Sequence, residues 1–305
     1  MKPLSISVHA APEDARHGDD ELQYPEMPRG MATFSMPHLP EDADRSAMAA
    51  AQQLLQTFLD ALNGWTFDAL ATGPRLDLRG QPAAVLGVLN DALGEGEVSA
   101  RVEGSSGCDV HVQESVFTGI WRVREFNAKS GAEGEETAGK ETAYRLEASS
   151  LPTVLLDAAY QGAQPTLPEV VLPEDAMNAS ALFTEIRAQL ALLGANGCAD
   201  SATSSHEINL TLLPLTSADH QALKEALPVG PVAIISKSFG SCRVTSTGTR
   251  HVWRVQQFNN KNTLILNALV IAERPLLILA AAEDIEDARE RLEKLISWMR
   301  ADTEA

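Results

Sequence analysis

The chain begins with no sustained hydrophobic pattern and then alternates amphipathic helical segments with short segments of alternating apolar and polar residues. Apolar residues recur every three or four positions in two stretches, at Leu54, Leu55, Phe58 and Leu62 and at Leu182, Ile186, Leu190 and Leu193. This spacing predicts two amphipathic helices, with Gly64 and Gly194 as C-terminal stop signals. Each leads to a predicted strand, 75–80 or 207–213, and then to a second helix. Those second helices cover 82–94 and 217–228, the latter with Ser217 as a plausible N-cap.

Two sets of strands follow these helices, predicted from period-two alternation at 97–103, 108–116, 119–126 and 142–148, and at 231–237, 242–247, 250–258 and 262–271. Trp121 and Val123, like Trp253 and Val255, lie two positions apart and predict one buried strand face in each set. Helices followed by an antiparallel meander define an α+β unit.

The two sets of elements also match in sequence. A shift of 134 residues places "LNDALGEGEV" over "LKEALPVGPV" with five identities in ten positions, Leu76 on Leu210 and Cys108 on Cys242. A shift of 132 places "GIWRVREFN" over "HVWRVQQFN" with five further identities. The sequence therefore predicts a tandem duplication of a helix-strand-helix-meander unit, with loops absorbing the insertions.

The predicted organisation has five parts: a Pro-rich flexible arm at 1–45, a first α+β repeat at 46–160, a linker at 161–179, a second repeat at 180–283 and a C-terminal helix at 284–305. In the last segment an apolar stripe recurs every three or four residues, at Ile285, Ala288, Leu292, Leu295 and Met299. Whether the repeats form one fused sheet or two domains is open at this point.

Charge and composition exclude several function classes. The 42 acidic and 24 basic residues leave a formal charge of −18, which repels nucleic acid and anionic lipid. Aromatic residues are only 5% of the chain, so a base-stacking platform is not expected. No apolar run approaches the about 18 residues of a membrane span, and the N-terminal segment contains no apolar h-region and no twin-arginine pair. We therefore expect a cytoplasmic protein without membrane insertion.

Candidate chemistry is sparse. Phosphate-loop, dinucleotide-binding, zincin and hydrolase-elbow motifs are absent from the sequence, so we expect no enzyme and no cofactor. Cys108, Cys198 and Cys242 form no C-x-x-C pair. The matched pair Cys108 and Cys242 supports one alternative function, delivery of an iron–sulfur cluster or iron held by the two thiolates. The competing interpretation is that both cysteines are small packing residues. A third alternative is an enzyme that uses a polar groove around His251.

Several segments resemble one known family. "SKSFGSCRVTSTGTRHVWRVQQFNNKNTLILNALVIAERP" and "LAAAEDIEDARERL" are similar to the C-terminal conserved region of the HupH/HyaF/HoxQ hydrogenase expression proteins, and "INLTLLPLTSADHQAL", "GEGEVSARV…GIWRVREFN" and "FSMPHLPED" resemble other segments of that family. The resemblance implies an accessory chaperone for maturation of an uptake [NiFe]-hydrogenase. It also implies binding of the small-subunit precursor before twin-arginine export, with other hydrogenase accessory proteins as further partners.

The residues predicted to bind such a client come from two places. The first is the strand-turn-strand segment of the second repeat, which is cationic and hydroxyl-rich on an acidic chain, and the second is the arm. These candidates are Phe239, Arg243, Thr245, Ser246, Thr247, Arg250 and His251, with Phe34, Met36 and Leu39 of the arm. Arginine is enriched in binding hot spots, and exposed positions that differ between repeats are free to specialise.

Overall fold

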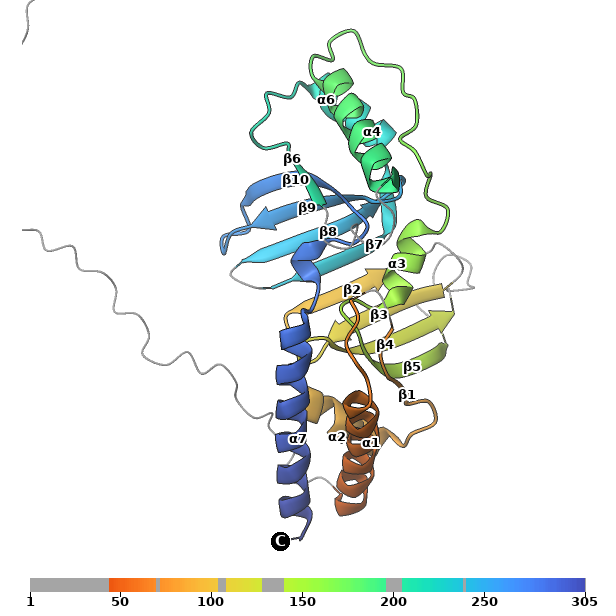
Figure 1. Ribbon diagram of the computed structural model, residues 1–305, viewed down its shortest axis with the longest axis vertical. Coiled ribbons are helices and arrows are strands. Elements are labelled where there is room, and N and C mark those ends of the chain that lie inside the picture. The colour runs from red at the N-terminus through yellow and green to blue at the C-terminus, as the bar shows by residue number, and fades with distance from the viewer. Residues whose placement is uncertain are drawn as a thin grey trace, which may run out of the picture. The chain divides into compact units, whose positions relative to one another are not determined.

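The computed structural model describes residues 44–69, 72–103, 108–127, 140–195, 205–237 and 240–304. They build an α+β fold around one ten-stranded sheet, in the order β1-β5-β4-β3-β2-β7-β8-β9-β10-β6 (Figure 1). Each neighbouring pair of strands is antiparallel. The sheet is continuous from the first predicted repeat to the second, since β2 pairs directly with β7. The predicted arm at 1–45 lies almost wholly outside the described residues.

The elements agree closely with the sequence pattern. The strands are β1 (Arg75–Asp77), β2 (Val98–Val102), β3 (Cys108–Glu114), β4 (Ile120–Asn127), β5 (Glu141–Ala148), β6 (Ser205–Asn209), β7 (Val229–Ser236), β8 (Ser241–Thr247), β9 (Val252–Phe258) and β10 (Leu264–Ala272). The helices are α1 (Arg45–Asn63), α2 (Ala83–Leu93), α3 (Thr153–Tyr160), α4 (Ala179–Ala195), α6 (Ser217–Ala226), the 3-10 turn η1 (Leu276–Ile278) and α7 (Ala282–Glu304). The sequence pattern did not single out α3 and η1.

The strand order is the same in two halves of the sheet. Read from its outer edge, the first half (β1 to β5 with α1 to α3) runs β1-β5-β4-β3-β2, and the second half (β6 to β10 with α4, α6 and η1) runs β6-β10-β9-β8-β7. Corresponding side chains make corresponding hydrogen bonds. Trp121 Nε1 donates to the carbonyl oxygen of Ser149 at 2.9 Å, and Trp253 Nε1 donates to that of Ala272 at 3.2 Å.

The junction between the halves has matching backbone contacts on both sides. The amide of Glu103 donates to the carbonyl oxygen of Pro231, and the amide of Lys237 donates to that of Glu97, both at 3.0 Å. At an offset of 134 residues, Lys237 is the counterpart of Glu103 and Pro231 is the counterpart of Glu97. The two hydrogen bonds are therefore equivalent. The sequence alignment is therefore correct for β2 and β7.

The same alignment is wrong for β3 and β8. Val110 pairs with Val102 in the first half, and Cys242 pairs with Ser236, the counterpart of Val102, in the second half. The offset is thus 132 from β3 onward, because the second half is two residues shorter in the connection before this strand. Cys242 corresponds to Val110, and the predicted equivalence of Cys242 with Cys108 is wrong.

A similar correction applies to the outer strands. The amide of Leu78 donates to the carbonyl oxygen of Tyr144 at 2.8 Å, and the amide of Leu210 donates to that of Asn267 at 2.9 Å. Leu78, and not Leu76, is therefore the counterpart of Leu210.

Polar caps define the starts of two helices. The Asp44 carboxylate accepts from the amide of Ser46 at 3.1 Å at the start of α1, where it satisfies a free N–H group. At α6 the N-cap is Thr216, one residue before the predicted Ser217. Thr216 and Asp219 form a capping box, which holds two otherwise unpaired amides.

The two faces of the central strands have different cover. On one face an apolar row crosses the sheet and packs against α3 and η1: Val123, Val112, Ala100, Ile234, Val244 and Val255. On the other face α4 and α6 share a core with Leu269 and Ile271 of β10, and Asn90 of α2 bonds to Tyr144 of β5. In the described part of the chain, the helices on that face therefore lie toward the outer strands.

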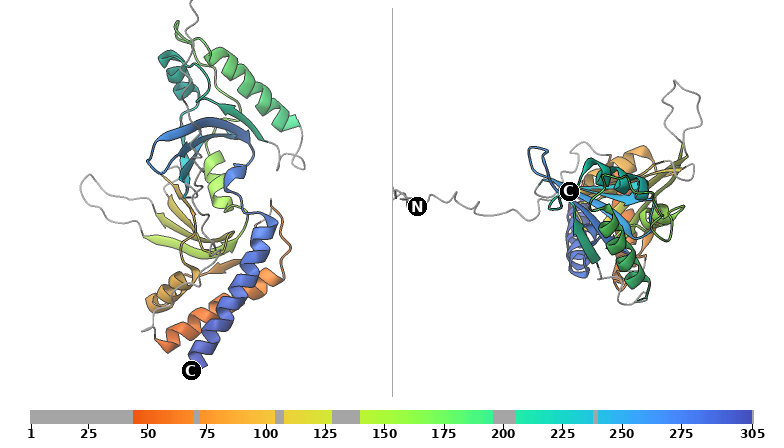
Figure 2. Two further views of the ribbon diagram at one scale, coloured as in Figure 1. Left: turned by 90° about the vertical axis from the view of Figure 1, so that its left-hand side faces the viewer. Right: turned by 90° about the horizontal axis from the view of Figure 1, so that it is seen from above.

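The C-terminal helix returns to the first half. In Figures 1 and 2, α7 lies beside α1, and its predicted apolar stripe is buried: Ile285, Ala288, Leu292, Leu295 and Met299. The stripe is thus core packing. The second half receives instead the segment 161–178, in which Leu167 is buried in the α4–α6 core while Val171 and Met177 are exposed.

Candidate functional site

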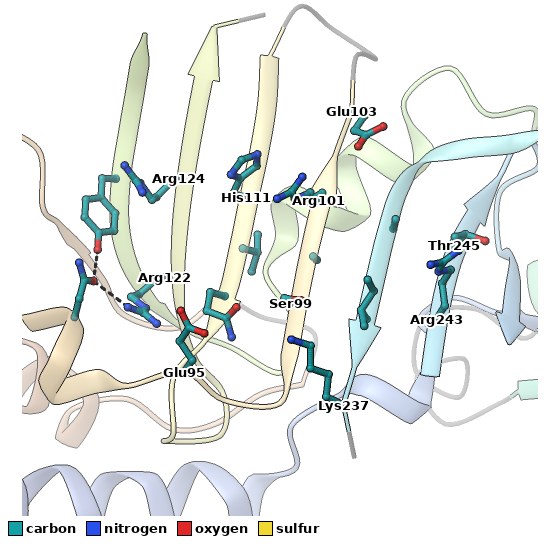
Figure 3. Close-up of a pocket in the computed structure, with 17 residues that line it drawn as sticks. Glu95, Ser99, Arg101, Glu103, His111, Arg122, Arg124, Lys237, Arg243 and Thr245 are labelled. Atoms are coloured by element: carbon teal, nitrogen blue, oxygen red, sulfur yellow. Dashed lines mark hydrogen bonds between the residues drawn. The ribbon is translucent and has the colours of Figure 1, made fainter. Parts of the chain in front are cut away.

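A polar groove crosses the face of the central strands that α3 and η1 leave free. Its volume is about 830 Å³, and Figure 3 shows its side chains rising from β2, β3, β4, β7 and β8. Five cationic side chains line it, Arg101, Arg122, Arg124, Lys237 and Arg243. Among the described residues, Glu95 and Glu103 are the only carboxylates in its lining, so the described lining has a net charge of +3 on a chain of −18.

Strand register brings these cations together. Because alternate residues of a strand share a face, the partners across the ladder form rows. One row joins Arg124, His111 and Arg101. The neighbouring row joins Arg122 to Arg243 across β3, β2 and β7. Residues more than 100 positions apart in sequence therefore line one surface.

Two of the cations are held by the protein itself. The Arg122 guanidinium donates to Asn90 Oδ1 at 3.0 Å and to the carbonyl oxygen of Gly94 at 2.5 Å. Burial lowers its pKa, and its Nε is buried without a hydrogen-bond partner in the described structure. Arg124 pairs with Glu141 at 2.5 Å and lies over the Tyr144 ring, 5.3 Å from its centroid. These contacts tie both guanidinium groups to the first-half wall of the groove.

The other three cations are available to a ligand. Arg101, Lys237 and Arg243 are exposed, and none of them forms an ion pair with another described residue. His111 lies between the two groups, and its pKa is lowered by burial and then by the charge of Arg101. A neutral imidazole is therefore favoured at neutral pH.

The groove includes only part of the predicted client-binding set. Arg243, which is exposed, and Thr245, which is half-buried, line it from β8. Ser246 and Thr247 do not, because both are buried. Ser246 Oγ accepts from the amide of Val232 at 3.1 Å, and Thr247 Oγ1 donates to the carbonyl oxygen of Val252 at 2.8 Å. Their prediction as exposed binding residues is wrong, since their hydroxyls satisfy backbone groups of the fold.

Arg250 and His251 lie in the β8–β9 turn, away from the groove lining. Arg250 is exposed, and its amide donates to the carbonyl oxygen of Gln164 at 2.9 Å. His251 has a φ of 64°, and its Nδ1 lies 3.2 Å from Tyr160 Oη. Burial lowers the pKa of His251. The predicted client-binding residues Arg243 and His251 therefore do not line the same groove.

The two described cysteines lie at opposite ends of the strand ladder. Cys242 lies in the same row of the ladder as Val98. Cys108 lies two residues past Val110, which pairs with Val102, four residues along the strand from Val98. The two cysteines are therefore six residues apart along the strand direction. At about 3.3 Å per residue this is about 20 Å. One ion cannot bridge both thiols within a single chain, and the predicted joint site is wrong. Cys242 is buried, which raises its pKa and disfavours the thiolate.

Other predicted residues lie outside the described part of the chain: Phe34, Met36, Leu39, Cys198 and Phe239. Sequence reasoning missed Arg101, Arg122, Arg124 and Lys237. A signal for the first three was present, because they occupy polar positions in alternating strands. In the described ranges no helix could cross a membrane, and no three His, Cys, Asp or Glu side chains are grouped for a metal ion.

An open groove in which three separated cations have no ion-pair partner among the described residues has the geometry of a binding surface. A model of the family described as "HupH hydrogenase expression protein, C-terminal conserved region" matches residues 48–137 and 176–299. The chain belongs to this family, as its resemblance predicted.

Curated relatives match over most of the chain. The chain is 36% identical to the hydrogenase expression/formation protein HoxQ of Cupriavidus necator, over 98% of this chain and 99% of that one. It is 34% identical to HupH of Rhodobacter capsulatus, over 98% of each chain. It is 31% identical to the hydrogenase-1 operon protein HyaF of Escherichia coli K12, over 69% of this chain and 68% of that one. A solved HupH structure from Thiobacillus denitrificans has 26% identity and a TM-score of 0.35, and covers 39% of this chain and 95% of that chain.

Proposed function

We propose that this protein is a non-enzymatic accessory factor of hydrogenase maturation that binds a hydrogenase precursor through the central groove. Relatives that match nearly the whole chain are called hydrogenase expression/formation proteins, which supports the biological context. The groove is the observation that carries the binding role, because it gathers three cations without an ion-pair partner among the described residues on a sheet face that no described helix covers.

The partner that we propose is the small-subunit precursor of a [NiFe]-hydrogenase, held in the cytoplasm before twin-arginine export, with other accessory proteins of the same system as further partners. The factor acts without a resident metal or cofactor in this proposal. A chaperone must release its client, and ion pairs at an exposed groove suit release because they form quickly and are screened by water.

The proposal extends to the origin of the fold. Equal strand order, the paired tryptophan hydrogen bonds and the symmetric β2–β7 junction support a tandem duplication. After duplication the two halves of the groove diverged. Arg101 of β2 has Ile235 of β7 as its counterpart, and His111 of β3 has Arg243 of β8. The groove is therefore asymmetric, which allows it to bind a client in one orientation.

Affinity capture tests the proposal. The tagged chain is expressed with the hydrogenase operon, and the captured precursor is quantified by immunoblot with antibodies to each hydrogenase subunit. We expect the wild-type protein to retain the small-subunit precursor and Arg101→Glu/Arg243→Glu to lose it. Arg250→Glu is the matched control, because Arg250 is exposed in the same half of the sheet as Arg243 but lies outside the groove lining.

Three results would contradict this function. Capture of neither subunit precursor by the wild-type protein would refute the hydrogenase role. Equal capture by wild type and the folded double variant would place binding elsewhere. Normal hydrogenase activity in cells lacking the gene would show that the protein is not needed for maturation.

A further inference from the structure

We infer that the groove recognises an extended acidic peptide segment of its partner. The inference rests on the proposed function, because it names the chemistry of the client segment. A ligand for this surface must supply negative charge to Arg101, Lys237 and Arg243, which have no ion-pair partner among the described residues. Carboxylates are the matching groups, since arginine binds them with paired, parallel hydrogen bonds.

The three cations are spread over the sheet. Arg101 and Arg243 lie two strands and two residues apart in the ladder, so their Cα atoms are about 12 Å apart. Lys237 lies one strand and two residues beyond Arg243, about 8 Å from it. Figure 3 shows their side chains at three separate places above the strands. This distribution favours a ligand with several separated anionic groups over one phosphate or one carboxylate.

An extended peptide fits the dimensions of the groove. The lining runs from β4 through β3, β2 and β7 to β8, which is four strand spacings or about 19 Å. An extended segment of about six residues covers that length, and its alternate side chains point the same way about every 7 Å. Asp or Glu at alternate positions would therefore present carboxylates about 7 Å apart, a spacing comparable to the separations of about 8 and 12 Å between the cations that long Arg and Lys side chains can bridge.

The floor of the groove also suits a peptide. Ser99 and Thr245 add hydroxyl groups to the lining, where they can bond to backbone amides or carbonyl oxygens. Single-stranded nucleic acid stacks successive bases on several exposed rings, but of the described lining only the His111 ring is exposed, since Tyr144 is 4% exposed and its hydroxyl donates to Asn90 at 2.7 Å. The observations therefore favour an acidic peptide over a polynucleotide.

Peptide binding tests the inference directly. The full chain is titrated into a fluorescent octapeptide of alternating Glu and Thr, with an alternating Gln and Thr peptide as the neutral control, and anisotropy is followed at low and physiological ionic strength. We expect binding of the Glu peptide only, weaker at higher salt because exposed ion pairs are screened. Arg101→Glu/Arg243→Glu should weaken binding by about tenfold or more, and Arg250→Glu should leave it unchanged.

A neutral pair of substitutions, Arg101→Gln/Arg243→Gln, keeps the test decisive if the charge reversal perturbs folding, and circular dichroism checks each variant. The inference is overturned if the Glu peptide does not bind, if it binds both folded double variants like wild type, or if the Gln peptide binds equally well. It is also overturned if an oligothymidylate of similar length binds the groove more tightly. Capture of precursor without peptide binding would overturn this inference alone, whereas peptide binding without any precursor capture would overturn the hydrogenase function and support the groove chemistry.

Discussion

The two halves of the sheet share a strand order but differ in what covers them. The first half is closed by α7, whose apolar stripe is buried beside α1, whereas the second half is covered by the extended segment 161–178. Among the described residues, every exposed large apolar side chain except Trp298 of α7 lies in the second half or in the segment 161–178 that packs on it. The comparison teaches that one strand topology supports a closed, structural half and a more open half. The groove lies where the two halves meet.

The largest expected effect comes from exchanging one turn residue between the halves. Gly119 has a φ of 81°, and a Cβ built on it would overlap Cδ1 of Ile285 in α7. Gly119→His should lower the free energy of unfolding by about 2–5 kcal/mol, from left-handed strain and overpacking. The reverse change, His251→Gly, should alter it by about 1 kcal/mol or less, because lost packing against Tyr160 offsets relieved strain. Urea unfolding measures the change in unfolding free energy for both variants. Equal losses would show that packing of α7 against Gly119 does not distinguish the two turns.

A second difference between the halves is pH-dependent. Glu114 is 5% exposed, and its counterpart in the second half is the neutral Ser246. Burial raises the pKa of Glu114 to about 7 from 4.5, against the lowering effect of hydrogen bonds from Gly119 and Val98. The folded state therefore binds this proton more tightly than the unfolded state. The resulting stability is full below pH 4.5 and is lost as pH rises to about 7, a change of about 3 kcal/mol.

Glu114→Gln keeps the shape and an acceptor but removes the titration. We expect the variant to match wild type near pH 5 and to exceed its unfolding free energy by up to about 3 kcal/mol at pH 8. Denaturant titrations give the difference in unfolding free energy between variant and wild type at each pH. The change of this difference between pH 5 and pH 8 reports on Glu114, because the contributions of other titrating groups cancel. A gap that is the same at pH 5 and pH 8 would contradict the raised pKa.

The cysteines should respond differently because their environments differ. Cys242 is 8% exposed and packs in the central core, whereas Cys108 is partly exposed. Cys242→Ser should cost about 1–3 kcal/mol through burial of a hydroxyl, and Cys108→Ser about 0.5 kcal/mol or less. Both variants should still capture precursor. Anaerobic iron analysis of the purified protein is the matching measurement, and iron that is lost from either folded variant would support metal delivery instead.

The smallest effect is expected on the open surface of the second half. Met177 and Leu212 are 77% and 79% exposed, so Met177→Ser and Leu212→Ser should each change the unfolding free energy by about 0.5 kcal/mol or less. Leu182→Ala is the control, since Leu182 is 4% exposed and its truncation should cost about 2–5 kcal/mol. Thermal or chemical unfolding compares the three. Large losses at the two exposed sites would show that this surface is part of the core.

Sequence periodicity predicted most of the secondary structure, because period-two and three-to-four spacings report directly on buried faces. It did not place the two-residue deletion, since Cys108 over Cys242 looks like an identity until strand pairing assigns Cys242 to Val110. The groove was missed for a related reason. Arg101 and Arg243 belong to strands that meet only through the β2–β7 pair, and no local pattern reports that pairing.

The return of α7 to α1 has a consequence for the order in which the protein is made. Residues of α1 such as Leu55 and Phe58 are fully buried in the finished fold, and α7, which follows the second half along the chain, packs against this helix. Domains often fold from the N-terminus during synthesis. Here the half that leaves the ribosome first cannot close its core until the second half and α7 have also been made. A product truncated before α7 would therefore leave the apolar surface of α1 exposed.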